Sequence, residues 1–247
     1  MKLKIAILLL ALLAFATGCE DEAKSKIYDA QACLDNLDET VPYTDLRTAA
    51  DACQNKLGTV TTQEANTIRC SARLLMGGMT ANRFAKAADQ MDGASNEAAL
   101  ISVLSLKGIG SSTADKQTDA KDLAKSMFNA CTNSGVPGLV YIAGLSLTGT
   151  VMTNTVTLNC NGNPNASLDE CSEDELITQA DQIVSDCQSG SCEPESIGQA
   201  AVAISDAYCT GDKAEEDICV DIEAAITAGG GNSSTIGEQL LNLLANP

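Results

Sequence analysis

The sequence predicts an all-α protein whose helices are joined by disulfides into a bundle or a short array of antiparallel helix pairs. Apolar residues recur every three to four positions along most of the chain, the spacing of one face of a helix. Eleven cysteines are present, with no histidine and no Cys-x-x-Cys pair. Aromatic residues make up only 3% of the chain. We therefore expect helices that pack closely through small side chains, with disulfides replacing part of the missing aromatic burial.

The first 19 residues have the pattern of an export signal. Lys2 and Lys4 precede an apolar run over 5–15, which is too short to span the roughly 30 Å hydrocarbon core. Small residues at 16–18 lead directly to Cys19. This segment resembles a bacterial lipoprotein precursor. The resemblance implies that Cys19 is diacylated on sulfur, freed by cleavage at its amino side and then N-acylated, which places the protein on a lipid bilayer.

Position 16 departs from the lipoprotein pattern, since alanine stands there where leucine is most common. The alternative is an ordinary secreted protein cut after Ala16. Parity favours the lipoprotein, because an odd cysteine count in an exported chain leaves one thiol over. Assigning Cys19 to lipid leaves ten candidates for disulfides in an oxidising compartment: Cys33, Cys53, Cys70, Cys131, Cys160, Cys171, Cys187, Cys192, Cys209 and Cys219.

The residue after the lipidated cysteine bears on which membrane holds the protein. In the sorting scheme that the resemblance implies, aspartate at this position is the common signal for retention in the inner membrane. Glu20 stands there instead. We therefore expect the cell envelope, with the outer membrane mildly favoured.

The charge of the mature chain limits its partners. Residues 19–247 contain 13 basic and 33 acidic residues, a net charge of −20. Nucleic acid and anionic lipid headgroups are unexpected partners, because binding to either needs a basic surface.

Five amphipathic helices are expected before residue 107. Apolar positions at helical spacing place the first two over 27–37 and 46–57. Thr61 and Glu64 have the spacing of a capping box ahead of a third helix that reaches Met79. Helices near 80–91 and 97–106 complete this region.

A faint internal repeat in this region resembles tetratricopeptide-like helix pairs, although the aromatic and proline landmarks of that family are missing. Ala49-Ala50-Asp51 reappears as Ala87-Ala88-Asp89, at a spacing near that of a helix-pair repeat. If the first three helices stack as antiparallel neighbours, Cys33 and Cys70 lie level to within about one residue. Cys53 would be about five residues off level. The repeat therefore predicts a Cys33–Cys70 disulfide.

The middle of the chain contains its most unusual segment. A polar helix over 113–131 follows the glycine-containing stretch 108–112, and no charged residue occurs over 126–168. Within that gap we expect a buried helix over 136–152 that begins with Pro137, and a short extended segment near 153–158. The uncharged segment could form a central core element, a pocket wall or a surface in contact with the membrane.

Four further helices are expected near 173–187, 195–209, 214–228 and 236–244, separated by short polar turns. The chain then divides into four parts: a signal peptide over 1–18, a lipidated tether over 19–26, an N-terminal helical region over 27–107 and a C-terminal disulfide-rich helical region over 113–247.

One polar segment has the register of a calcium loop. Asn159, Asn161, Asn163 and Glu170 fall at its positions 1, 3, 5 and 12. Pro164 occupies the position where the loop needs glycine. A turn pinned by a disulfide explains the same residues, so both interpretations stay open.

Catalytic patterns are weak. The absence of histidine removes Ser-His-Asp and Cys-His nucleophilic catalysis, although paired carboxylates could still perform acid–base chemistry. We expect no cofactor. The favoured function is a non-catalytic binding or scaffold module that engages another envelope protein through a helical surface. The alternatives are a carboxylate-dependent hydrolase and an envelope protein that binds a small ligand or calcium.

Overall fold

The computed structural model describes residues 22–91 and 97–245, and these ranges are helical over most of their length. The first helix covers 22–35. The elements after it are α2 (Tyr43–Asn55), α3 (Gln63–Met76), α4 (Ala81–Met91), α5 (Glu97–Val103), α6 (Thr113–Ser134), α7 (Pro137–Thr153), β1 (Leu158–Cys160), β2 (Asn163–Ala166), η1 (Leu168–Glu170), α8 (Glu173–Thr178), α9 (Ala180–Asp186), η2 (Cys187–Ser191), α10 (Pro194–Ala207), η3 (Gly211–Glu215), α11 (Asp217–Gly229) and α12 (Ser233–Leu244).

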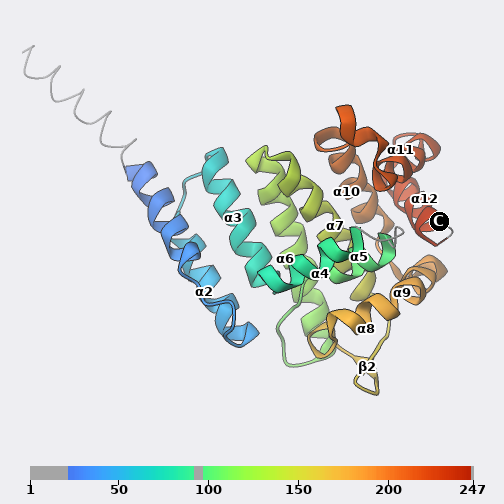
Figure 1. Cartoon of the computed structure of the whole chain (residues 1–247), viewed down its shortest axis with the longest axis horizontal. Helices are drawn as coiled ribbons and strands as arrows, with labels where there is room; N and C mark the ends of the chain where they lie inside the picture. Colours follow the sequence, from blue (N-terminus) through green and yellow to red (C-terminus); the bar gives the residue numbers. More distant parts are fainter. Residues whose placement is uncertain (1–21, 92–96, 246–247) are drawn as a thin grey trace, which may run out of the picture.

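The long helices form a row, as Figure 1 shows. Each packs against the next in the order α2, α3, α6, α7, α10, α12 and α11. The short helices α8 and α9 pack with α5, which in turn contacts α4 and α7. One connected set of buried side chains extends from Ala30 to Leu244 and includes residues on both sides of 108–112. The prediction of a disulfide-stapled all-α fold is confirmed.

The uncharged segment forms the central helix α7. Pro137 occupies its first turn, where the backbone N–H that proline lacks would have no hydrogen-bond partner within the helix. Residues 143–153 are buried without interruption, because α6, α10, α5 and α9 all pack against α7. The expectation of a buried helix over 136–152 is confirmed. In the described part of the chain, no helix is both long and apolar enough to cross a membrane.

Small residues bring neighbouring helices close together. A Cβ atom built on Gly198 of α10 would lie 1.8 Å from the carbonyl oxygen of Ser233. On the facing helix α12, a Cβ atom on Gly237 would lie 1.9 Å from the carbonyl oxygen of Pro194. The two glycines thus permit a backbone-to-backbone approach that any side chain would prevent.

The disulfide pairing corrects one prediction. The structure joins Cys33 to Cys53, with Cα atoms 5.4 Å apart, and Cys70 to Cys131, with Cα atoms 4.8 Å apart. The prediction of Cys33–Cys70 is wrong because it assumed a closed stack of the first three helices. The helices instead form a row, so α3 packs against α6, and Cys70 faces that helix.

Several element boundaries also differ from expectation. The first helix already begins at residue 22, within the expected tether, and Glu22 and Lys26 form an ion pair one turn apart at 2.7 Å. Thr62, not Thr61, caps α3 by accepting a hydrogen bond from the Ala65 N–H. The extended segment expected near 153–158 begins at Leu158.

The helix expected over 173–187 is divided into α8 and α9 at Gln179. The backbone of Gln179 leaves the helical conformation there, with φ −98° and ψ 1°, and its Oε1 accepts a hydrogen bond from the Asn159 N–H at 2.9 Å. The division therefore ties the two short helices to the adjacent hairpin.

Candidate functional site

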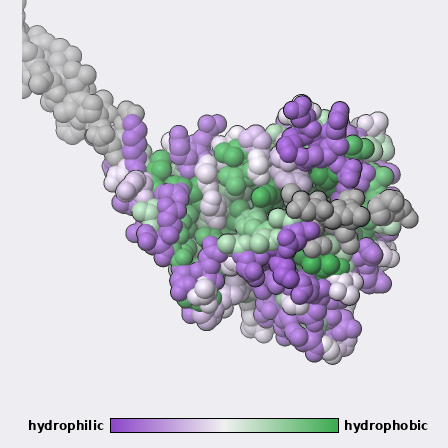
Figure 2. Space-filling view, viewed as in Figure 1, coloured by the Kyte–Doolittle hydropathy of each residue, from purple (hydrophilic) through white to green (hydrophobic). Residues whose placement is uncertain are grey.

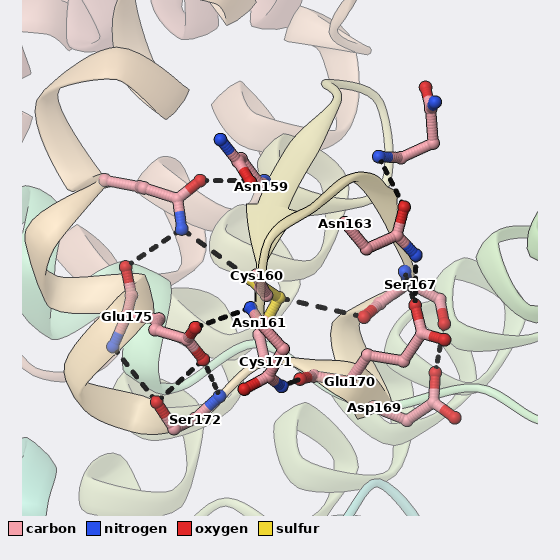
Figure 3. Close-up of a disulfide and its surroundings, with 12 residues drawn as sticks. Asn159, Cys160, Asn161, Asn163, Ser167, Asp169, Glu170, Cys171, Ser172 and Glu175 are labelled. Atoms are coloured by element: carbon pink, nitrogen blue, oxygen red, sulfur yellow. Dashed lines mark hydrogen bonds between the residues drawn. A yellow bond between two sulfur atoms is a disulfide. The ribbon is translucent and has the colours of Figure 1, made fainter.

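A polar hairpin and the start of α8 form the most densely hydrogen-bonded surface feature (Figure 3). The strands β1 and β2 pair in antiparallel fashion, and the Cys160–Cys171 disulfide holds the turn end of the hairpin. Asn161, at the tip, has a φ angle of 52°, a left-handed conformation that asparagine tolerates better than most residues. The sequence placed a turn here, and the disulfide holds it.

The calcium candidates are used mainly to build this turn. Asn161 Nδ2 donates to the Glu170 carbonyl oxygen at 2.5 Å, and Asn163 Nδ2 donates to Glu170 Oε2 at 3.3 Å. Glu170 Oε2 also accepts the Ser167 N–H at 2.9 Å. Asn159 lies apart, at the edge facing α8 (Figure 3). Three of the four candidates are thus neighbours, and the amide nitrogens of Asn161 and Asn163 face Glu170.

No set of three Asp, Glu, Cys or His side chains gathers in a way that could hold a metal ion, as far as the described residues extend. The hydrogen bonds of the hairpin match the alternative of a disulfide-pinned turn. Calcium binding stays a prediction that calorimetric titration with calcium would test.

Glu175 links the hairpin to α8. Its carboxylate accepts hydrogen bonds from the backbone N–H groups of Asn161 and Ser172, at 2.7 Å and 2.9 Å. These donors, the Asn161 N–H first, lower the pKa of Glu175 below its usual value. The Ser172 hydroxyl completes a capping box at the start of the helix.

A groove of about 490 Å³ adjoins this hairpin along α8 and α9. Every side chain that lines it is a carboxylate, an amide or a hydroxyl: Asn159, Asp174, Glu175, Thr178, Gln179 and Gln182. Such a lining offers many hydrogen-bond acceptors. One cation already pairs with a lining residue, since Lys86 lies 2.7 Å from Asp174. The two carboxylates favour a positively charged group over an anion.

A second cluster joins α5 to α11. Burial, a hydrogen bond with Asp221 and the negative charges of Asp221 and Asp217 raise the pKa of Glu97 to about 7. The stacked rings of Tyr141 and Tyr208 lie near this cluster, with centroids 4.1 Å apart. The raised pKa means that Glu97 is partly protonated near neutral pH and can then donate a hydrogen bond to Asp221. Glycoside hydrolysis needs carboxyl groups about 5 to 10 Å apart, so a directly hydrogen-bonded pair does not match that geometry.

Arg83 is an unexpected buried cation. It is 1% exposed on α4, and none of its guanidinium nitrogens has a hydrogen-bond partner in the described structure. Glu173 Oε1 lies 3.9 Å from its Nε. Burial lowers the pKa of Arg83 to about 10, although the negative charge of Glu173 acts in the opposite direction and raises it. Nothing in the sequence predicts the pairing of Arg83 with Glu173, because Arg83 lies in an ordinary polar and alanine-rich helix.

Charge is divided unequally along the chain. Residues 19–125 contain 12 basic and 16 acidic residues, whereas residues 126–247 contain 17 acidic residues and one basic residue, Lys213. Some cations of the first part pair with acids of the second, as Lys86 does with Asp174 and Lys116 with Asp169, each at 2.7 Å. Many acids of the second part face solvent, and hydrophilic residues dominate the surface around α8 and near α10 and α11 (Figure 2).

All ten cysteines downstream of Cys19 are paired. Besides the three disulfides described above, Cys187 is bonded to Cys192 and Cys209 to Cys219. Cys19 itself lies outside the described residues. No protein-family model matches the chain, and no curated protein or solved structure is detectably similar to it.

Proposed function

We propose that this protein is a bacterial envelope lipoprotein, attached to the membrane by acylated Cys19, that acts as a non-catalytic binding module. The pairing of every other cysteine carries the proposal of attachment. Ten disulfide-bonded cysteines suit an oxidising compartment outside the cytoplasm. They also leave one cysteine with a different role, directly after an export signal.

The binding function is supported by the polar groove and by the acidity of residues 126–247. The groove is lined by uncharged hydrogen-bonding groups and by the carboxylates of Asp174 and Glu175. A partner with lysine or arginine side chains in an exposed segment would find acceptors there and an attractive field around them. We infer that the groove along α8 and α9 receives a basic segment of another envelope protein.

Site-specific photo-cross-linking in the producing cell tests this proposal. A photoreactive amino acid at Gln182, which lines the groove, should give a covalent adduct with one defined protein. The matched control is Lys56, an exposed residue that follows α2. The proposal fails if position 182 gives no adduct, or if both positions capture the same proteins equally.

A carboxylate-dependent hydrolase is the second candidate, and the raised pKa of Glu97 beside Asp221 is what favours it. A carboxyl group that titrates near neutral pH can act as a general acid next to an ionised carboxylate. A hydrolytic activity that copurifies with the protein and disappears in both Glu97→Gln and Asp221→Asn variants would favour the enzyme over the binding module.

A further inference from the structure

The Cys187–Cys192 disulfide closes the smallest ring in the protein. Its cysteines are five residues apart, whereas the other four pairs are separated by 10 to 61 residues. The stabilisation that a disulfide gives through the unfolded state increases with the length of the closed loop, so a short loop gains least. This disulfide is therefore the one whose opening costs the folded protein least.

This disulfide also lies at an accessible place. A pocket of about 380 Å³ is lined by both cysteines together with Gln188, Pro194, Glu238, Leu241 and Asn242. Cys192 is partly exposed, whereas Cys187 is buried. The sulfur atoms of Cys70–Cys131, in contrast, belong to residues with no exposed surface. An incoming thiol can thus approach Cys192 from the pocket.

The surrounding structure is held by contacts that do not depend on this bond. Gln188 Nε2 donates to the Leu241 carbonyl oxygen at 3.1 Å, which fixes the η2 turn to α12. On the other side of the turn, Glu193 forms ion pairs with Lys121 and Lys125 of α6 at 2.9 Å and 2.8 Å. The helices on either side of the turn should therefore stay in place when the disulfide opens.

We propose that Cys187–Cys192 is a thiol–disulfide exchange site that accepts small neutral or cationic thiols at Cys192. A thiolate attacks Cys192 Sγ and forms a mixed disulfide, while the bond to Cys187 breaks and Cys187 Sγ leaves as a thiolate that takes a proton from water. A second thiol then attacks the mixed disulfide and releases Cys192 as a thiol. The products are the reduced pair and one molecule of the oxidised small disulfide, so two electrons are transferred.

The charge of the pocket sets the class of thiol. Glu238 lines the pocket, and Lys213 is the only basic residue in residues 126–247. An anionic thiol such as glutathione meets an unfavourable field there, whereas a cationic thiol is attracted. One unit charge a few ångströms from another in water contributes a factor of about five in rate or affinity.

Stepwise reduction of the full-length protein tests the site. The native protein in detergent is equilibrated with rising thiol concentrations, trapped with an alkylating reagent and mapped by mass spectrometry. Cys187 and Cys192 should be alkylated at the lowest concentration, while the circular dichroism of the helices is unchanged. The Cys33–Cys53 pair is the internal control, because Cys33 is also partly exposed but closes a ring of 20 residues.

The rates at which three thiols of different charge open the disulfide test the charge selectivity. They are compared at equal thiolate concentration. Cysteamine should open the disulfide roughly 25-fold faster than 2-mercaptoethanesulfonate, with neutral 2-mercaptoethanol about fivefold from each. A Glu238→Gln variant should reduce that ratio to about twofold or less. The proposal is overturned if another pair is alkylated first, if all pairs open together with unfolding, or if the order of the thiols is reversed.

Discussion

Glu97 is a residue whose protonation should affect the stability of the fold. It begins α5, and its pKa rises to about 7 from 4.5 because burial and Asp221 disfavour its charged form. A carboxyl group whose pKa is higher in the folded state does not reduce stability at a pH below its pKa in the unfolded state. It reduces stability progressively as the pH rises from that value through its pKa in the folded state. The cost should therefore develop between about pH 4.5 and pH 7.

We expect Glu97→Gln to increase the free energy of unfolding by about 1 to 2 kcal/mol at pH 8, a figure reduced for solvent screening of this half-buried group. At pH 4 the variant and the parent should agree. Urea denaturation across this pH range measures the difference. Glu195→Gln, at an exposed position in the first turn of α10, is the control. An equal effect of Glu97→Gln at pH 4 and pH 8 would refute the raised pKa of Glu97.

The residues with perturbed environments could not be found from the sequence. Glu97 meets Asp221, and Arg83 meets Glu173, only because distant helices are brought together. Local patterns contain no information about such contacts. The calcium register shows a different limit of spacing, because it suggested ligand roles for Asn161 and Asn163 but did not reveal their hydrogen bonds to Glu170.

At the scale of the element, α7 contains a matched pair of glycines. A Cβ atom on Gly149 would lie 2.0 Å from the carbonyl oxygen of Ile101 in α5, whereas a Cβ atom on Gly138 would meet nothing within 4 Å. We expect Gly149→Ala to lower the free energy of unfolding by about 1 to 3 kcal/mol, since a backbone atom must move. Gly138→Ala should be neutral or stabilising by up to about 1 kcal/mol. Thermal or urea unfolding measures the stability of both variants. Equal changes in stability would contradict this packing.

A second element-scale prediction concerns the contact between α6 and the start of α10. Hydrogen bonds and charges from Lys125 and Lys121 lower the pKa of Glu193 to about 2. A lowered carboxyl pKa gives stability that is present above the unfolded value of 4.5 and is lost as the pH falls towards 2. Glu193→Gln should reduce stability at pH 7 by less than about 1 kcal/mol, because the pair is largely exposed.

The difference between Glu193→Gln and the parent should disappear near pH 2, and it should shrink in molar salt. Unfolding measured at two salt concentrations and two pH values separates these effects. A loss that is independent of both salt and pH would mean that Glu193 acts through packing.

Whole elements were predicted well where one physical signal dominated. The uncharged run and Pro137 were sufficient to place α7, because such a segment is stable only when neighbours cover every face. The division between α8 and α9 was not predictable. It accompanies a contact of the Gln179 side chain with a hairpin that lies elsewhere in the sequence.

At the scale of the whole molecule, Cys70–Cys131 links α3 to α6 and closes the longest loop, with a sequence separation of 61. A chain-entropy calculation gives it about 4 kcal/mol of stabilisation, compared with about 3 kcal/mol for the 20-residue separation of Cys33–Cys53. We expect the double variant Cys70→Ala/Cys131→Ala to be less stable than the double variant Cys33→Ala/Cys53→Ala. Denaturant midpoints in the reverse order would show that native-state packing, not loop length, decides the contribution.

The division of charge is a further property of the whole chain. The nearly balanced first part follows the proposed anchor, and the acidic second part contains the polar groove. The sequence alone revealed this division but not its use. The structure shows that ion pairs such as Lys116–Asp169 join the two parts, while many other acids stay exposed to solvent.

The attachment of Cys19 is the central claim, and the intact mass of the protein isolated from membranes of the producing cell tests it most directly. We predict a chain of residues 19–247 that lacks ten hydrogens, because five disulfides are closed, and that carries a diacylglyceryl group and a further acyl chain. A Cys19→Ala variant should lack the lipid mass and leave the membrane fraction. A chain that begins at residue 17, or one with a free or cross-linked Cys19 thiol, would contradict the proposed anchor.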